Sequence, residues 1–317
     1  MGKLNFGVFL PFYALQSQTK PNELFTRLRD VVFECERLEY HSVWIDDHLM
    51  FGKTPLLECW STLAALASVT RRIRFGTMVT SAAFRNPAVL AKAAATIDIV
   101  SNGRLEFGMG AGVQKEEHEA YGFTFPNPSA RIDRLREAIE IIKAMWTEEN
   151  INYKGKYFLV NSAFCEPKPV QKPHPPIIIG GGGENLTLKV TAQHADRVDF
   201  GYQAGLKEYR HKLRVLENHC NAIGRPFVEV EKSCWPAGQI ILGENSRELN
   251  EKIGRLKPKT VSRKDYEKYT FAGTSVEFFE TLRPYEELGV THFMLAFADL
   301  PEPSSLRIFA QRAKEFS

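Results

Sequence analysis

The chain has 317 residues, of which 44% are hydrophobic, so it can bury the core of one large barrel or of two ordinary domains. Its 41 basic and 38 acidic residues give a formal charge of +3 without a dense basic run, which argues against a nucleic-acid partner. Five cysteines without a CxxC pair, a start that leads directly into strand-like sequence, and no apolar stretch of about 20 residues predict a cytoplasmic protein with reduced thiols and no membrane span.

Short β-rich apolar runs alternate with amphipathic helical stretches along the whole chain, and this alternation predicts a parallel sheet. Eight strands with eight helices predict a single α/β domain over residues 1–317, a closed (β/α)₈ TIM barrel, with an open doubly wound sheet as the alternative. The predicted strands span residues 4–10, 42–46, 73–80, 105–109, 176–180, 198–201, 230–242 and 291–297. The predicted helices span residues 22–38, 57–69, 87–100, 131–146, 184–194, 207–223, 276–288 and 303–316.

Two insertions interrupt the alternation. After the fourth helix, residues 149–175 resemble a hairpin followed by a proline-rich strip that cannot be helical. After the seventh predicted strand, residues 255–273 form a second polar stretch, which we predict to be a mobile loop. Long loops in compact domains tend to be functional, so both insertions are candidates for ligand contacts.

Polar side chains follow the second and third predicted strands, at the barrel end where chemistry collects. Asp47 and His48 come directly after the second strand, and a carboxylate beside an imidazole can exchange protons near neutral pH. A loop cap with a structural histidine explains the same pair equally well. Met78, Val79 and Thr80 end the third strand, where the threonine either hydrogen-bonds a ligand or simply terminates the strand.

Glycines follow the fourth and fifth predicted strands. Gly110, Ala111 and Gly112 would let a ligand approach the backbone closely, but the turn-rich sequence after them does not fit a Rossmann dinucleotide fingerprint. The run Gly180, Gly181, Gly182 and Gly183 precedes a predicted helix, which is typical of a phosphate site made of bare amides at a helix N-terminus. A plain glycine-rich loop is the weaker alternative.

Together these segments resemble the luciferase-like monooxygenase superfamily, and within it the oxidoreductases that depend on the deazaflavin coenzyme F420. The resemblance covers nearly the whole chain. Its most specific stretches are residues 55–67, 72–80, 84–92, 99–104, 108–112, 120–122, 167–183 and 288–293.

The resemblance implies roles for the strand-end residues. Asp47 and His48 would lie near the ring of the coenzyme, and Met78–Val79 would form a non-proline cis peptide behind it. Thr80 would contact the ring edge, the residues from Gly110 to Gly112 would line the ribityl chain, and those from Gly180 to Gly183 would hold the phosphate. One departure concerns the sugar-phosphate dehydrogenases of the family, in which an acidic glutamate follows the second glycine motif. Val113 stands there instead, so Glu117 or His118 would have to supply the proton.

These features predict an F420-dependent enzyme that transfers a hydride to or from a small organic substrate, with His48 as the proton partner. The alternatives are an FMN-dependent monooxygenase that uses reduced flavin and O₂, and a barrel that only stores or senses flavin. The eight histidines show no HxxxH spacing, so no metal site is predicted. Family members are often homodimers, and the apolar helices at residues 57–69 and 87–100 suit such a partner. Substrate specificity would lie in the loops at residues 12–21, 49–54, 114–127 and 255–273.

Overall fold

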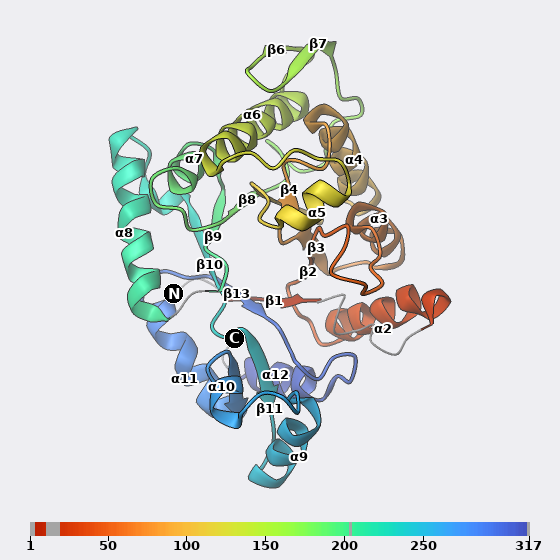
Figure 1. Ribbon diagram of the computed structural model, residues 1–317, viewed down its shortest axis with the longest axis vertical. Coiled ribbons are helices and arrows are strands. Elements are labelled where there is room, and N and C mark those ends of the chain that lie inside the picture. Colours follow the sequence, from red (N-terminus) through yellow and green to blue (C-terminus); the bar gives the residue numbers. More distant parts are fainter. Residues whose placement is uncertain (1–3, 11–19, 203–204, 316–317) are drawn as a thin grey trace.

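A closed barrel of parallel strands forms the centre of the molecule in the computed structural model, which describes residues 4–10, 20–202 and 205–315 (Figure 1). The pairing of β3 with β5 closes the ring, and β4 continues the line of β3 along β5, so eight strand positions make up the barrel. The predicted (β/α)₈ fold is confirmed. The barrel strands are β1 (Asn5–Phe9), β2 (Ser42–Ile45), β3 (Arg74–Thr77), β4 (Thr80–Ser81), β5 (Leu105–Gly110), β8 (Ile177–Gly180), β9 (Arg197–Asp199), β10 (Glu231–Cys234) and β13 (His292–Leu295).

Helices surround the strands (Figure 1), and their first residues follow local capping signals. The helix α4 begins at Pro87 because the Asn86 side chain accepts hydrogen bonds from the next amides. By the same device, α6 begins at Pro128 behind Asn127, three residues before the predicted start. The helices are η1 (Pro21–Glu23), α2 (Leu24–Arg37), α3 (Cys59–Val69), α4 (Pro87–Val100), α5 (Lys115–Ala120), α6 (Pro128–Thr147), α7 (Thr187–His194), α8 (Leu206–Ala222), η2 (Phe227–Glu229), α9 (Ser246–Leu256), α10 (Arg263–Tyr266), α11 (Ser275–Glu286) and α12 (Ser304–Ala313).

The barrel interior is filled by a small apolar cluster around the buried Trp44, separate from the larger core between strands and helices. Gly7 on β1 and Gly76 on β3 make room for this indole, since a Cβ at either residue would lie within 2.6 Å of a Trp44 atom. Because side chains fill the interior, no channel runs through the barrel, and ligands can bind only at its ends.

The predicted seventh strand at residues 230–242 is wrong as a single element. It forms β10 in the barrel and β11 (Gln239–Leu242) outside it, because Pro236 and Gly238 interrupt the ladder between them. The strand β11 pairs in parallel with β12 (Thr270–Gly273). The predicted mobile loop at residues 255–273 is also wrong, because it holds the end of α9, the helix α10 and β12. Ile241, Ile253 and Tyr266 bury a separate apolar cluster there.

The predicted hairpin in residues 149–175 is confirmed as β6 (Ile151–Lys154) paired antiparallel with β7 (Leu159–Ala163). All five cysteines are buried free thiols. Among the described helices, none combines the length and the apolar character that a membrane span requires. The predicted specificity loop at residues 12–21 lies almost entirely outside the described residues.

Candidate active site

A cavity of about 180 Å³ lies at the carboxyl ends of β2, β4 and β5, the barrel end at which ligands bind in this fold. Three carboxylates line it, and we therefore call it the acidic cavity. It brings together both predicted catalytic residues and several predicted cofactor contacts. Its lining residues are Asp46, Asp47, His48, Met78, Val79, Ser81, Phe84, Gly110, Ala111, Gly112, Val113, Glu117, His118 and Gly180.

A second cavity, of about 410 Å³, adjoins the first and is bounded by the glycine run after β8. We call it the glycine-loop cavity. The two cavities share Ala111, Gly112, Val113 and Gly180, so the two glycine motifs meet although they lie far apart in the sequence. A ligand with an elongated shape can therefore contact both motifs at once. The remaining lining residues of the glycine-loop cavity are Pro128, Arg131, Ile132, Gly181, Gly182, Gly183, Glu184, Asn185, Leu186 and Thr187.

The peptide bond between Met78 and Val79 is cis, at the position that the family resemblance implied, and it separates β3 from β4. The Val79 side chain occupies space that side chains on β5 and β8 would otherwise fill. A Cβ on Gly110 would lie 2.6 Å from Val79 Cγ2, and a Cβ on Gly180 would lie 2.7 Å from Val79 Cγ1. These two glycines are thus required by packing against Val79, whatever ligand contacts they also make.

The glycine run offers fewer amides to a ligand than its sequence suggests. The Gly181 amide donates to Asp199 O at 2.8 Å, and the residue has a φ of +125°, which favours glycine. In the described part of the chain, the amides of Gly182 and Gly183 donate no hydrogen bond. The helix α7 begins at Thr187 and not at residue 184 as predicted, so a turn separates it from the glycines. Two bare amides therefore remain for an anion.

Arg131 of α6 adds a cation to the glycine-loop cavity, and the sequence analysis missed it. Its guanidinium donates to Gly112 O and stacks on the Phe125 ring, 4.0 Å from the ring centroid. The buried Nε has no hydrogen-bond partner among the described residues. A buried donor without a partner is costly, so this group suits a bound anion.

Asp47 is committed to a structural ion pair. Its carboxylate accepts two hydrogen bonds from Arg85, at 2.6 and 2.9 Å, and one from the Ser81 amide at 3.3 Å. Burial raises the pKa of Asp47, and Arg85 opposes this shift. Because Arg85 also pairs with Glu58 at the start of α3, the three charges join the ends of β2 and β4 to that helix. The predicted Asp47–His48 proton pair is not formed.

The partner of His48 is Glu117 on α5, 69 residues along the chain. His48 Nδ1 lies 3.0 Å from Glu117 Oε2, while Glu117 Oε1 accepts hydrogen bonds from the amides of Leu49 and Met50. The hydrogen bond that His48 donates to Glu117 raises the pKa of His48, against the opposing effect of burial. Burial acts to raise the pKa of Glu117, but the bonds from His48 and the two amides lower it overall. This arrangement fixes the imidazole and leaves Nε2 for a ligand.

Replacing Glu117 by glutamine is expected to lower the pKa of His48, because the amide removes the negative charge and leaves the effect of burial. In the wild type, the pairing contributes stability that is fully present below pH 6.5 and is lost as the pH rises through the elevated pKa. NMR titration of the His48 ring measures the shift. The matched control is Glu116→Gln on the exposed side of α5, and an unchanged His48 pKa in Glu117→Gln would contradict the assignment.

Two further polar atoms in the acidic cavity have no hydrogen-bond partner among the described residues, Asp46 Oδ1 and His118 Nε2. His118 Nδ1 donates to Gln114 O at 2.7 Å, and the ring packs between Phe84 and Phe125, so its orientation is fixed. The free Nε2 faces the space left by Gly112, where a Cβ would lie 2.8 Å away. Burial raises the pKa of Asp46 to about 6.

Comparison with known proteins places this site in a family. The family model described as luciferase-like monooxygenase matches residues 4–294. The chain belongs to the luciferase-like monooxygenase family. The resemblance seen in the sequence is therefore confirmed, and the protein is an enzyme of this family, as predicted.

Curated relatives of this luciferase-like protein include two enzymes named F420-dependent glucose-6-phosphate dehydrogenase. The one from Amycolatopsis mediterranei is 35% identical over 198 residues, which are 58% of this chain and 57% of the relative. The one from Gordonia bronchialis is 31% identical over 258 residues, which are 75% of this chain and 72% of the relative. This chain therefore covers a little over half the length of the first relative and 72% of the length of the second.

Two solved structures of other proteins share the fold across the whole chain. The coenzyme F420 dependent tetrahydromethanopterin reductase from Methanopyrus kandleri has a TM-score of 0.77 at 20% identity, covering 99% of this chain and 98% of its own. The EDTA monooxygenase from Chelativorans sp. BNC1 has a TM-score of 0.85 at 13% identity, covering 100% of this chain and 94% of its own. At such low identity these likenesses show the fold alone.

Thr80, the predicted ring-edge contact, does not line either cavity of this luciferase-like protein. It is fully buried, and its hydroxyl accepts a hydrogen bond from the Trp60 indole at 3.2 Å. Its neighbour Ser81 lines the acidic cavity instead, because successive side chains of a strand point to opposite faces. The ring-edge contact of Thr80 stays a prediction, and Ser81 is the residue of β4 that lines the acidic cavity.

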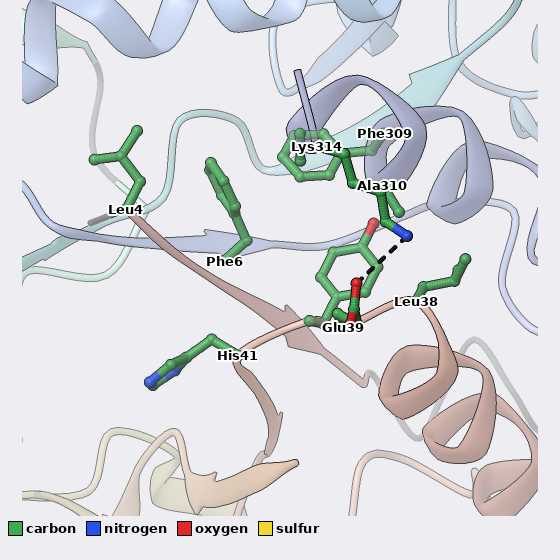
Figure 2. Close-up of a pocket in the computed structure, with 10 residues that line it drawn as sticks. Leu4, Phe6, Leu38, Glu39, His41, Phe309, Ala310 and Lys314 are labelled. Carbon is green, nitrogen blue, oxygen red and sulfur yellow. Dashed lines mark ion pairs between the residues drawn. The ribbon is translucent and has the colours of Figure 1, made fainter. Parts of the chain in front are cut away.

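Another cavity, of about 330 Å³, lies at the opposite end of the barrel, where Leu4 precedes β1 and His41 precedes β2. Most of its lining residues are apolar, and Figure 2 shows the ion pair between Glu39 and Lys314, which also line it. Lys314 Nζ lies 3.4 Å from Glu39 Oε2. In a barrel of this type, the amino-terminal end of the strands contributes to stability, and the chemistry lies at the other end. The acidic cavity is therefore the candidate active site.

Proposed function

We propose that this luciferase-like protein is an oxidoreductase that uses the deazaflavin coenzyme F420 and transfers a hydride between the coenzyme and a small organic substrate. The observation that carries the proposal is the junction of the two cavities. One offers bare amides and a cation to a phosphate, and the other offers titratable groups at the barrel mouth. The names of the two glucose-6-phosphate dehydrogenases support F420 as the coenzyme.

The residues present fit a phosphorylated deazaflavin. The amides of Gly182 and Gly183, together with the Arg131 guanidinium, would hold the phosphate, and Gly112 would line the ribityl chain. The Lys212 side chain lies beside Gly182, with its ammonium group next to the loop. When bound, the coenzyme accepts or supplies the hydride.

The α5 helix and its C-cap residue Tyr121 position the residues that would contact the substrate. Glu117 holds His48 through Nδ1, and the raised pKa of His48 favours a protonated ring, so its Nε2 can donate a hydrogen bond to a substrate oxygen. The segment after β2 is held in place as well, since the Tyr121 hydroxyl donates to Leu49 O at 3.0 Å. The α5 helix thus fixes the residues that would contact the substrate.

The acidic cavity favours an uncharged substrate over a sugar phosphate. Of its described lining residues, none is a lysine or an arginine, and a phosphate would meet the carboxylates of Asp46 and Glu117. Val113, which stands where the sugar-phosphate dehydrogenases carry a glutamate, is largely exposed and supplies no acid. We therefore do not extend the substrate of the named relatives to this chain.

The coenzyme is tested by incubating the protein with oxidised F420 or with FMN, removing free ligand, and recording the visible spectrum. We expect F420 to remain bound. Retention of FMN alone, with substrate-dependent O₂ uptake when reduced FMN is supplied, would replace the proposal with the FMN-dependent monooxygenase. If neither F420 nor FMN stays bound, the proposal that the two cavities form a flavin-type site is refuted.

Replacing Arg131 by alanine is expected to weaken F420 binding about 10- to 100-fold, since hydrogen bonds to a charged group contribute about 1.5–3 kcal/mol. Fluorescence titration of F420 measures the change. Arg134→Ala is the matched control, because Arg134 lies on the same helix and packs over an aromatic ring but does not line the cavity. Equal losses in the two variants would exclude a specific role for Arg131.

A further inference from the structure

The two adjacent carboxylates at the end of β2 face different surroundings. Along β2, Val43 and Ile45 pack into the core between strands and helices, whereas Trp44 lies in the barrel interior. Side chains of a strand alternate between its two faces, so Asp46 follows Trp44 toward the barrel mouth and Asp47 turns outward to Arg85. Asp46 accordingly lines the acidic cavity at the top of the barrel interior.

Asp46 is buried without being paired. Its side chain is only 9% exposed, and Oδ1 has no hydrogen-bond partner in the described part of the chain. Asp47, by contrast, has three hydrogen bonds, and Glu117 has three. A buried carboxyl oxygen without a partner costs free energy, which a ligand in the cavity can recover by hydrogen bonding to it.

We propose that Asp46 is a catalytic residue whose Oδ1 exchanges a proton with the hydroxyl or carbonyl oxygen of the substrate. This inference rests on the proposed function. In the oxidising direction, the substrate O–H bond breaks, a new O–H bond forms on Oδ1, and the electron pair stays on the substrate oxygen. The carbon then loses its hydride, with two electrons, to the oxidised deazaflavin and becomes a carbonyl. Reduction runs through the same transfers in reverse.

The charges around Asp46 suit this role. His48 from the same loop acts to lower the pKa of Asp46, while Asp47 and Glu117 of α5 act to raise it. Burial raises the pKa of the Cys59 thiol of α3, and the charge of Asp46 adds to this shift. Burial is the largest effect and raises the pKa to about 6, so the carboxyl can both take and give a proton near neutral pH. His48, held by Glu117, is left to bind the same substrate oxygen.

The test compares Asp46→Asn with Asp47→Asn. We expect Asp46→Asn to lower kcat about 10²- to 10³-fold, to remove the rise in oxidation rate near pH 6, and to bind F420 within about threefold of the wild type. Asp47→Asn should instead lower the unfolding temperature and keep the pH inflection, because it breaks the ion pair with Arg85. Asp46→Glu, which keeps a carboxyl group, should retain the inflection.

A second measurement does not depend on turnover. The Asp46 carboxyl carbon is assigned by NMR as the resonance that is missing in Asp46→Asn. In the ligand-free protein this resonance should titrate near pH 6, whether or not the protein shows F420-dependent turnover. If the wild type binds no F420, the proposed function fails whatever Asp46 does. If F420 binds, but Asp46→Asn keeps its turnover and its pH inflection, or the Asp46 resonance titrates at the ordinary value of 3.8, only the role of Asp46 is overturned.

Discussion

Replacing His48 by alanine is expected to lower kcat/KM for hydride transfer about 10²- to 10⁴-fold, the range that a positioned proton-exchanging or hydrogen-bonding side chain contributes. The reason is geometric, since Glu117 fixes the imidazole at 3.0 Å and leaves Nε2 toward the ligand. Steady-state kinetics with F420 measures the loss, and F420 affinity should change little because the proposed phosphate contacts lie in the glycine-loop cavity, which His48 does not line.

His194→Ala is the control for this experiment. His194 is also half-buried and lies near a glutamate, Glu140, at 3.7 Å, but it ends α7 and lines neither cavity. It should keep nearly full activity. If His48→Ala retains wild-type kcat/KM with every substrate that the enzyme turns over, His48 does not bind the reacting oxygen, and the proton partner must be another residue of the acidic cavity.

Replacing Arg85 by alanine is expected to destabilise the protein by about 3–5 kcal/mol, because it leaves the buried Asp47 carboxylate without its cation. Three of the hydrogen bonds between charged groups at this corner of the site would be lost together. The free energy of unfolding from urea denaturation measures the loss, and the variant should also bind F420 more weakly because the ends of β2 and β4 are released.

The exposed ion pair of α2 provides the comparison. Arg29 pairs with Asp30 at 2.8 Å on the surface, and Arg29→Ala should cost less than about 1 kcal/mol. An Arg85→Ala variant that is as stable as Arg29→Ala would show that Asp47 is solvated or protonated in the folded protein, and would reopen its assignment as a structural residue.

The fold was largely predictable because its signals are local. The alternation of strand and helix patterns, Asn86 before Pro87, and the glycines after β5 and β8 each act within a few residues of the chain. The errors fell where distant segments decide the structure. The strand β11 leaves the barrel to pair with β12, and the polar sequence before β12 is ordered by Ile241, Ile253 and Tyr266, whose apolar cluster joins three separate elements.

The sequence by itself predicted the barrel and the strand ends proposed for the site, and its resemblance to a known family implied the position of the cis peptide. The tertiary structure decided which of the side chains there are available for chemistry. Asp46 and Asp47 are neighbours of the same type and both line the acidic cavity, yet Arg85 neutralises Asp47, whereas Asp46 Oδ1 has no hydrogen-bond partner among the described residues. Glu117 reaches His48 across 69 residues, and Arg131 reaches the glycine loop from another helix. Periodicity is set by the backbone and can be read locally, whereas pairing between charges depends on distances that only the folded chain creates.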